Sequence, residues 1–172
     1  MGIKKEILYY DFFEFKENYY LVAVTEQGLS FVSSDDNQFY EFSSFYPQKM
    51  LIKDSTKVRP YLTQIVEYLQ HKRKKFTIPI DILDFGTPLQ KEVFRTVMKI
   101  PYGRTMTLGT ITAALGVNGR TREVRHALAL NPILIVIPTH RVVLSAKKLG
   151  IFRGGPELHA ALIELEREPR ES

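Results

Sequence analysis

The 172-residue sequence lacks cysteine altogether. Disulfide bonds, thiolate metal sites and thiol nucleophiles are therefore excluded for these residues. It also lacks any run of about 18 apolar residues, the length that a membrane-spanning helix needs. The charged segment Lys4-Lys5-Glu6 does not resemble a secretory leader. We therefore expect no membrane partner and a cytoplasmic location, with the nucleus as an alternative.

What the sequence does have is a moderate excess of basic residues. It carries 24 Lys and Arg against 19 Asp and Glu, so the net charge is +5 at pH 7. Such an excess favours a polyanionic partner such as nucleic acid, although a merely soluble basic protein is about as common. The hydrophobic share of 44% is ordinary for a globular protein. The length suffices for one large domain or two small ones.

The first half of the chain has the pattern of a small α/β domain. Residues 19–24 and 29–32 are rich in Tyr, Val and Phe and predict two strands, with a hairpin turn at 25–28 between them. From 58 to 68 the apolar residues change to helical spacing. We expect this domain to cover residues 1–85.

The second half, residues 86–172, predicts a succession of helices. Thr87 is suited to cap a first helix and Thr107 a second, which Gly116 ends. A third helix is expected over 121–130, with basic residues at its start. Two helices joined by a tight turn are typical of a helix-turn-helix, although the pattern alone also fits a small helical bundle. The apolar run Ile133–Ile137 predicts a buried strand.

Several motifs then follow in a fixed order, and they carry a resemblance to a known family. They are Gly86-Thr87-Pro88-Leu89-Gln90, Ile100-Pro101-Tyr102-Gly103, Arg122-x-Val124, Asn131-Pro132, Ile137-Pro138-Thr139-His140-Arg141-Val142-Val143 and Gly150-Ile151-Phe152-Arg153-Gly154-Gly155. This segment resembles the C-terminal domain of the O6-alkylguanine-DNA alkyltransferases, whose signature is Pro-Cys-His-Arg-Val. The resemblance implies an α+β fold with a small N-terminal sheet-and-helix domain, then a winged helix-turn-helix DNA-binding domain.

In that family, a cysteine thiolate takes the alkyl group from guanine O6 and is consumed. The resemblance places Thr139 at the nucleophile position, His140 at the histidine that activates it through a water, and Glu166 at the glutamate that orients the histidine. Asn131 matches an asparagine that braces the turn before the active-site segment. A thiol with a pKa of about 8.5 can be deprotonated by a neighbouring base, whereas a threonine hydroxyl is far less acidic. The resemblance therefore implies that alkyl transfer is lost, with His140 more structural than catalytic.

The resemblance also assigns contacts with DNA. Arg122 matches the finger arginine that fills the place of an extruded nucleotide; the alternative is an exposed helix arginine. Further DNA contacts are expected from Arg120, Arg125, Thr107 and Arg141, and a base pocket from Leu108, Phe152, Arg153 and Pro138. Four positions depart from the family: Leu108 and Phe152 replace tyrosines, Arg153 a serine and Arg125 a small residue.

The preferred hypothesis is a protein that binds duplex DNA or O6-alkylguanine lesions through the minor groove without reversing them. It is similar to the alkyltransferase-like proteins, whose candidate partners are nucleotide excision repair proteins, although tryptophan or alanine is their usual replacement for cysteine. One alternative is an alkyltransferase enzyme whose nucleophile has been mutated. The other is a regulatory or architectural DNA-binding protein without lesion specificity. We expect no cofactor and no metal site, because the four histidines are widely scattered in the sequence.

Overall fold

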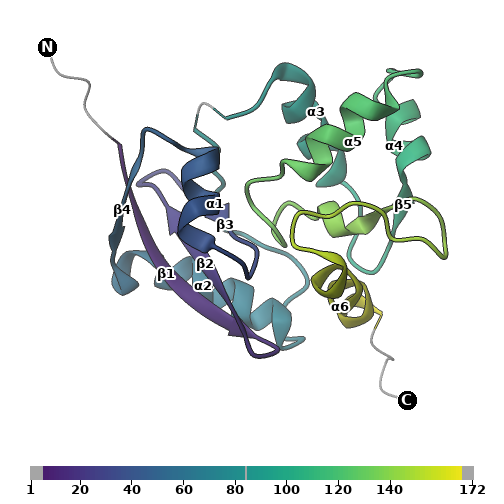
Figure 1. Ribbon diagram of the computed structural model, residues 1–172. Coiled ribbons are helices and arrows are strands. Elements are labelled where there is room, and N and C mark those ends of the chain that lie inside the picture. Colours follow the sequence, from purple (N-terminus) through teal and green to yellow (C-terminus); the bar gives the residue numbers. More distant parts are fainter. Residues whose placement is uncertain (1–5, 84, 168–172) are drawn as a thin grey trace, which may run out of the picture. The chain divides into compact units, whose positions relative to one another are not determined.

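The computed structural model describes residues 6–83 and 85–167 (Figure 1). Contacts divide the chain into two compact units between Phe85 and Gly86. The first unit is built on a four-stranded sheet, and the second consists mainly of helices. The mixed α+β fold predicted from the sequence is therefore confirmed. Among the described residues, no helix is both long and apolar enough to cross a membrane.

The sheet of the first unit contains four strands in the order β3-β2-β1-β4. Their bounds are Ile7–Phe15 for β1, Asn18–Val24 for β2, Leu29–Val32 for β3 and Met50–Lys53 for β4. The β1–β2 and β2–β3 pairs are antiparallel, and β4 pairs in parallel with β1. The predicted strands correspond to β2 and β3, and the predicted turn closes when the N–H of Thr25 donates to the carbonyl of Gly28 at 2.9 Å.

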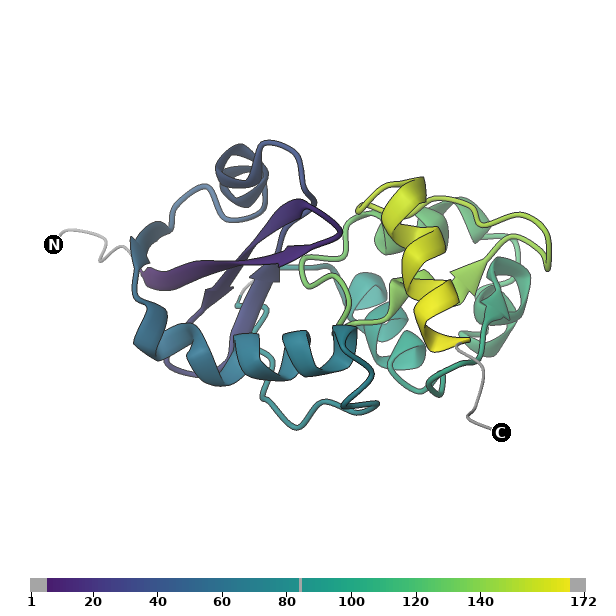
Figure 2. The same ribbon diagram turned by 90° about the horizontal axis from the view of Figure 1, so that it is seen from below.

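Two helices cover the opposite faces of this sheet (Figure 2). Helix α1 spans Gln38–Phe45, and its Phe42 packs into the core formed by Leu8, Leu21 and Phe31. Helix α2 spans Ser55–Leu69 and buries one apolar side against the other face. Successive strand residues point to opposite faces of the sheet. Both faces carry buried apolar side chains, and each face is covered by one of the two helices.

The second unit begins at a well-capped helix. The Thr87 hydroxyl accepts from the N–H of Gln90, whose side chain accepts in return from the N–H of Thr87. The Thr107 hydroxyl caps the next helix in a similar way. These caps confirm two predicted helix starts. The elements in order are α3 (Pro88–Val97), β5 (Met106–Thr107), α4 (Leu108–Ala114), α5 (Thr121–Ala129), the 3-10 helix η1 (Thr139–Arg141), β6 (Val142–Val143) and α6 (Pro156–Glu166).

The prediction of a strand at Ile133–Ile137 is wrong. The run is fully buried, but it folds as consecutive turns, in which the N–H of Ile137 donates to the carbonyl of Ile133 at 3.1 Å. Ile135 has a φ of 74°, in the left-handed region that a β-branched residue rarely adopts. The apolar composition was informative about burial, but burial alone does not distinguish a strand from a compact loop whose polar backbone groups are satisfied otherwise.

Gly28 offers a test of how tightly the first unit is packed. A Cβ added there would lie 2.7 Å from the carbonyl oxygen of Pro79, which also accepts the N–H of Leu29. We expect Gly28→Ala to lower the free energy of unfolding by about 1–3 kcal/mol, because backbone must move to admit the methyl group. Urea unfolding followed by circular dichroism measures this change.

Gly109 provides the matched control for the same substitution. It lies within α4, and the nearest atom to an added Cβ is the Thr107 hydroxyl at 3.9 Å. Gly109→Ala is therefore expected to stabilise the protein by about 0.5–1 kcal/mol through helix propensity. Equal effects of the two substitutions would contradict the close packing of Gly28 on Pro79.

Candidate functional site

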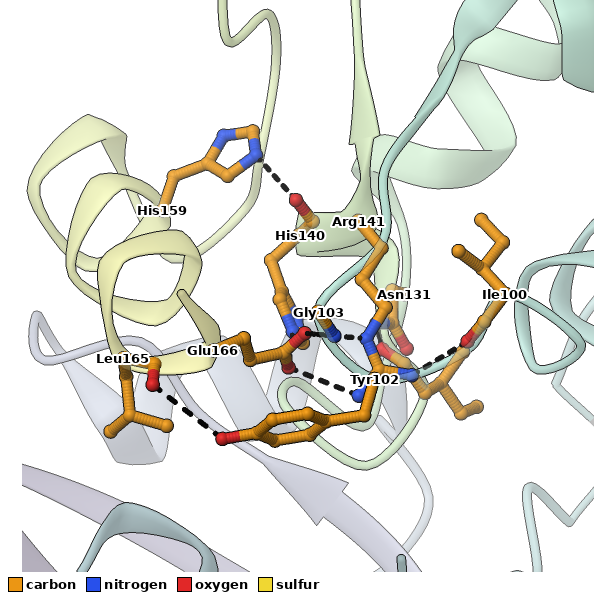
Figure 3. Close-up of polar contacts among 10 residues, drawn as sticks. Ile100, Tyr102, Gly103, Asn131, His140, Arg141, His159, Leu165 and Glu166 are labelled. Atoms are coloured by element: carbon orange, nitrogen blue, oxygen red, sulfur yellow. Dashed lines mark hydrogen bonds and ion pairs between the residues drawn. The ribbon is translucent and has the colours of Figure 1, made fainter. Parts of the chain in front are cut away.

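A buried carboxylate, that of Glu166 at the end of α6, organises the site in the second unit (Figure 3). Its side chain is 4% exposed. Nε2 of His140 donates to Oε2 at 2.7 Å, and Arg141 donates to both oxygens at 2.9 and 3.0 Å. The backbone N–H of Gly103 donates to Oε1 at 3.0 Å. The carboxylate thus joins α6, η1 and the loop after α3.

Arg141 lies inside this unit, whereas the family resemblance predicts it among the DNA contacts. Besides its two bonds to Glu166, its Nη1 donates to the backbone carbonyl of Ile100 at 2.8 Å (Figure 3). Only 8% of the residue is exposed. Its positive charge neutralises the buried carboxylate of Glu166. Without such a partner, an ionised carboxylate in this position would be strongly destabilising. The structure therefore gives Arg141 an internal role in holding Glu166.

Asn131 connects the turn after α5 to Thr139. Its Nδ2 donates to the Thr139 hydroxyl at 2.9 Å and to the carbonyl of Ile137 at 2.8 Å. Its Oδ1 accepts the N–H of Ile133 at 2.9 Å. These bonds satisfy the backbone of the buried 133–137 loop, which therefore needs no strand partner. The Thr139 side chain is consequently held in one position and is 3% exposed.

The imidazole of His140 is completely buried. Burial lowers the pKa of His140, although its hydrogen bond to Glu166 acts in the opposite direction. His159 of α6 donates from Nε2 to the carbonyl of His140 at 2.9 Å, and burial lowers the pKa of His159 as well. Phe152 packs against both rings, with centroids 6.3 Å from His140 and 4.9 Å from His159. The site is suited to holding a neutral imidazole beside residue 139 in a fixed orientation.

The predicted DNA-contacting arginines gather on and just before α5. Arg120, Arg122 and Arg125 are exposed, while Val124 and Leu128 on the other side of the helix are buried. Arg122 and Arg125 are three residues apart and therefore share one side of the helix. Thr107 caps α4, which packs against α5. The structure thus leaves three guanidinium groups exposed on and just before this helix, and Nε of Arg120 lies 4.0 Å from a carboxylate oxygen of Glu123.

The predicted base-pocket residues are only partly brought together. Leu108 and Arg125 line a small, largely aliphatic hollow together with Leu128, Val142, Val143, Leu144, Leu149, Gly150 and Ile151. Phe152, Arg153 and Pro138 are not among its lining residues. Phe152 is buried against the histidines, and Nε of Arg153 donates to the backbone carbonyl of Asn131 at 2.7 Å. Arg153 therefore braces the same turn as the Asn131 side chain.

Three contributors to the site were not recognised from the sequence. Gly103 and Ile100 contribute backbone groups, and His159 contributes a ring nitrogen. In the sequence, the segment Ile100-Pro101-Tyr102-Gly103 stands out only as one of the motifs of the family resemblance. Gly103 has a φ of 78°, and its close approach to α6 leaves little room for a side chain. A glycine at a turn after a helix was the available signal, but backbone donors have no signature of their own in a sequence.

Comparisons with known proteins match both units. Residues 88–168 match the DNA binding domain of 6-O-methylguanine DNA methyltransferases, and residues 8–82 match their ribonuclease-like domain. The inducible methylated-DNA–protein-cysteine methyltransferase of Bacillus subtilis is 34% identical over 171 residues, which cover 97% of this chain and 94% of that protein.

Solved structures show the same architecture. The O6-methylguanine methyltransferase of Mycobacterium tuberculosis superposes with a TM-score of 0.79 at 27% identity, covering 95% of this chain and 96% of that one. A complex of the OGT protein of the same organism with DNA superposes with a TM-score of 0.80 at 26% identity, covering 92% of each chain. A sheet unit followed by this helical unit is therefore the architecture of the 6-O-methylguanine DNA methyltransferases. The chain belongs to the methylated-DNA–protein-cysteine methyltransferase family.

Removal of the Glu166 carboxylate tests its structural role. Glu166→Ala would leave the buried charge of Arg141 unpaired and would deprive His140 and Gly103 of their acceptor. We expect a loss of about 3–5 kcal/mol in the free energy of unfolding, the range found when one partner of a buried ion pair is deleted. The exposed Glu164 of the same helix is the matched control, and Glu164→Ala should cost no more than about 0.5 kcal/mol. Similar losses for the two variants would contradict the assigned role.

The buried histidines also predict a pH dependence of stability. Their pKa values in the folded state lie below the reference value of 6.5, so the unfolded chain binds more protons just below that pH. The free energy of unfolding should therefore be highest above pH 6.5 and should fall as the pH decreases from 6.5. Urea titrations at intervals between neutral and mildly acidic pH measure the slope.

A substitution at His159 isolates part of that slope. His159→Gln keeps a side-chain N–H that can reach the carbonyl of His140 but removes the titrating ring. The slope below pH 6.5 should become shallower in this variant. A slope identical to that of the unaltered protein would show that His159 titrates alike in the folded and unfolded states.

Proposed function

We propose that this protein binds duplex DNA through helices α4 and α5 of the second unit, recognises O6-alkylguanine, and does not transfer the alkyl group to itself. The observation that carries the proposal is the combination of family membership with the complete absence of cysteine. The relatives are named for transfer to a protein cysteine, and these residues offer no such acceptor. Loss of the acceptor leaves binding as the activity that the rest of the domain supports.

The chemistry of Thr139 supports the second half of this proposal. The resemblance of Pro138-Thr139-His140-Arg141-Val142 to the signature Pro-Cys-His-Arg-Val supports placing Thr139 at the position of the family's cysteine. Its hydroxyl accepts a hydrogen bond from Asn131 and is buried. Attack on an alkyl carbon would require an alkoxide, which is much harder to form than a thiolate. Burial lowers the pKa of His140, which makes it a weaker base toward a hydroxyl.

The first half is supported by the exposed arginines and by the structural relatives. Residues 88–168 match a DNA-binding domain, and a relative with the same fold has been solved with DNA. Arg120, Arg122 and Arg125 are exposed, so their guanidinium groups can neutralise phosphates. Arg122 is suited to enter the duplex from the minor groove. Delivery of lesions to nucleotide excision repair proteins and a cytoplasmic location remain predictions.

Binding to matched duplexes with guanine or O6-methylguanine tests the proposal. We expect about tenfold tighter binding to the lesion duplex, equivalent to about 1.4 kcal/mol, and affinity for both that falls steeply with salt. Arg122→Ala should weaken lesion binding more than plain-duplex binding. Arg59→Ala removes the same charge from an exposed position of α2 and should preserve the lesion preference. Fluorescence anisotropy gives the affinities, and intact-protein mass spectrometry should detect no methyl adduct.

Two results would contradict the proposal in different ways. Equal affinity for the two duplexes would favour a DNA-binding protein without lesion specificity. A methyl adduct on the protein would show that another side chain accepts the alkyl group.

A second candidate function, an alkyltransferase whose nucleophile has been replaced, is favoured by the intact His140–Glu166 pair. Thr139→Cys separates the two candidates when the variant is incubated with O6-benzylguanine. We expect the restored thiol to remain unreactive, because residue 139 is 3% exposed and burial raises a thiol pKa. Rapid benzylation would instead indicate an otherwise competent enzyme.

A further inference from the structure

The first unit has strongly polarised charge along its sequence. Residues 6–48 contain a single basic residue, Lys16, and eight carboxylates: Glu6, Asp11, Glu14, Glu17, Glu26, Asp35, Asp36 and Glu41. Residues 49–75 have the opposite bias, with Asp54 and Glu67 against eight basic residues: Lys49, Lys53, Lys57, Arg59, Lys72, Arg73, Lys74 and Lys75. The net charge of the whole chain therefore conceals an acidic region that phosphates would avoid.

Exposed aromatic rings occur within the acidic region. Tyr40 is 78% exposed, Tyr19 is 56% exposed and Phe39 is 48% exposed. Phe39 packs edge-to-face on Tyr10 and Phe12, with centroids 5.4 and 5.9 Å away, so its ring is held in place. Core packing explains Phe42 on the same helix but does not explain Tyr40. Clustered exposed aromatics of this kind mark interaction sites on soluble proteins.

The strand register places carboxylates beside these rings. Glu14 lies directly opposite Tyr19 in the β1–β2 pair, and both therefore point to the face that α1 covers, the face to which Phe12 also belongs. The turn before α1 is attached to the same place, because Gln38 donates to the backbone carbonyls of Tyr19 at 2.9 Å and Asp35 at 3.2 Å. Asp35 and Asp36 are exposed in that turn.

Helix α1 lies on one face of the sheet in Figure 1, and the residues named above come from that helix, from the turn before it and from strand positions that point to the same face. We define the aromatic–acidic surface as Glu14, Tyr19, Asp35, Asp36, Phe39 and Tyr40. Of the nearby lysines, Lys53 of β4 lies beside Tyr10 on this face of the sheet, whereas Lys16 does not lie on it. Lys16 lies over the ring of Phe15, 5.6 Å from its centroid, and Phe15 points to the opposite face from Glu14.

We propose that the aromatic–acidic surface binds an extended segment of a partner protein that is rich in arginine and lysine. Guanidinium and ammonium groups are attracted to the faces of aromatic rings and to carboxylates, and this surface offers both. Single-stranded nucleic acid also stacks on exposed rings, but surfaces that bind it are basic, so the carboxylates disfavour it here. A purely apolar partner would leave the carboxylates desolvated without a counter-charge.

Titration of the full, isotopically labelled chain with a short synthetic peptide of alternating Arg, Gly, Lys and Ser tests this proposal. We expect saturable, salt-sensitive binding, with chemical-shift changes centred on the aromatic–acidic surface. Tyr40→Ala and Tyr19→Ala should each weaken the peptide about fivefold, the factor for one cation–π contact of about 1 kcal/mol. Both side chains are more than half exposed, so the variants should fold normally.

A charge-matched pair of variants separates local recognition from net charge. Asp35→Asn/Asp36→Asn should weaken peptide binding, whereas Glu157→Gln/Glu164→Gln, at exposed positions of α6, changes the total charge equally and should not. Absence of saturable binding, or equal effects of the two double variants, would overturn the proposal. An oligothymidylate that shifts the same resonances would identify nucleic acid as the occupant. Concentration-dependent dimerisation abolished by Tyr40→Ala would identify a second copy, and either result would also overturn the proposal.

Discussion

The buried carboxylate of Glu166 is the interaction on which the helical unit depends. It accepts hydrogen bonds from a histidine, an arginine and a backbone N–H that come from separate segments of the chain. Burying a carboxylate here lowers the stability of the fold unless the carboxylate is paired and fully hydrogen-bonded. The donors therefore stabilise the buried Glu166 side chain together. Because Arg141 supplies the counter-charge, His140 can remain neutral beside an ionised glutamate. The network therefore orders the segment around residue 139 whether or not that residue reacts.

The contacts that hold the segment around residue 139 in place do not involve a thiol, which explains how a chain without cysteine can retain the family's architecture. Asn131 holds Thr139 through the hydroxyl, and Arg153 braces the same turn through the carbonyl of Asn131. Both contacts stabilise the 133–137 loop and need no thiol. The exposed arginines of α5 depend only on the packing of that helix against α3 and α4. The proposed DNA contacts and the segment around residue 139 thus depend on different side chains.

The first unit combines a sheet covered on both faces with exposed aromatic and acidic side chains. Its sheet is covered by helices on both faces, yet α1 is short and leaves aromatic rings exposed next to carboxylates. The second half of this unit is basic, so the two halves favour different partners. An acidic, aromatic surface is unsuited to duplex DNA, and a basic polypeptide would not compete with DNA for it. Such a surface would allow a protein that binds DNA without altering it to recruit another protein.

The sequence by itself determined the features that depend on local chemistry. Thr87 and Thr107 identify helix starts because a hydroxyl can satisfy N–H groups two or three residues away. The absence of cysteine excludes a thiol acceptor in any fold. The motif order identified the family resemblance, and the α+β architecture followed from it.

Only the tertiary structure decided the features that depend on distant segments. Ile133–Ile137 has strand-like composition, but the side chain of Asn131 satisfies its backbone and makes a buried loop possible. Arg141 and Arg122 are the same type of residue, but Arg141 is buried in the domain because it pairs with a carboxylate 25 residues away in the sequence. Glu14 lies beside Tyr19 because the register of β1 and β2 brings them opposite each other. In each case the partner is distant in sequence, and no local pattern specifies which polar group will meet a given side chain once the chain is packed.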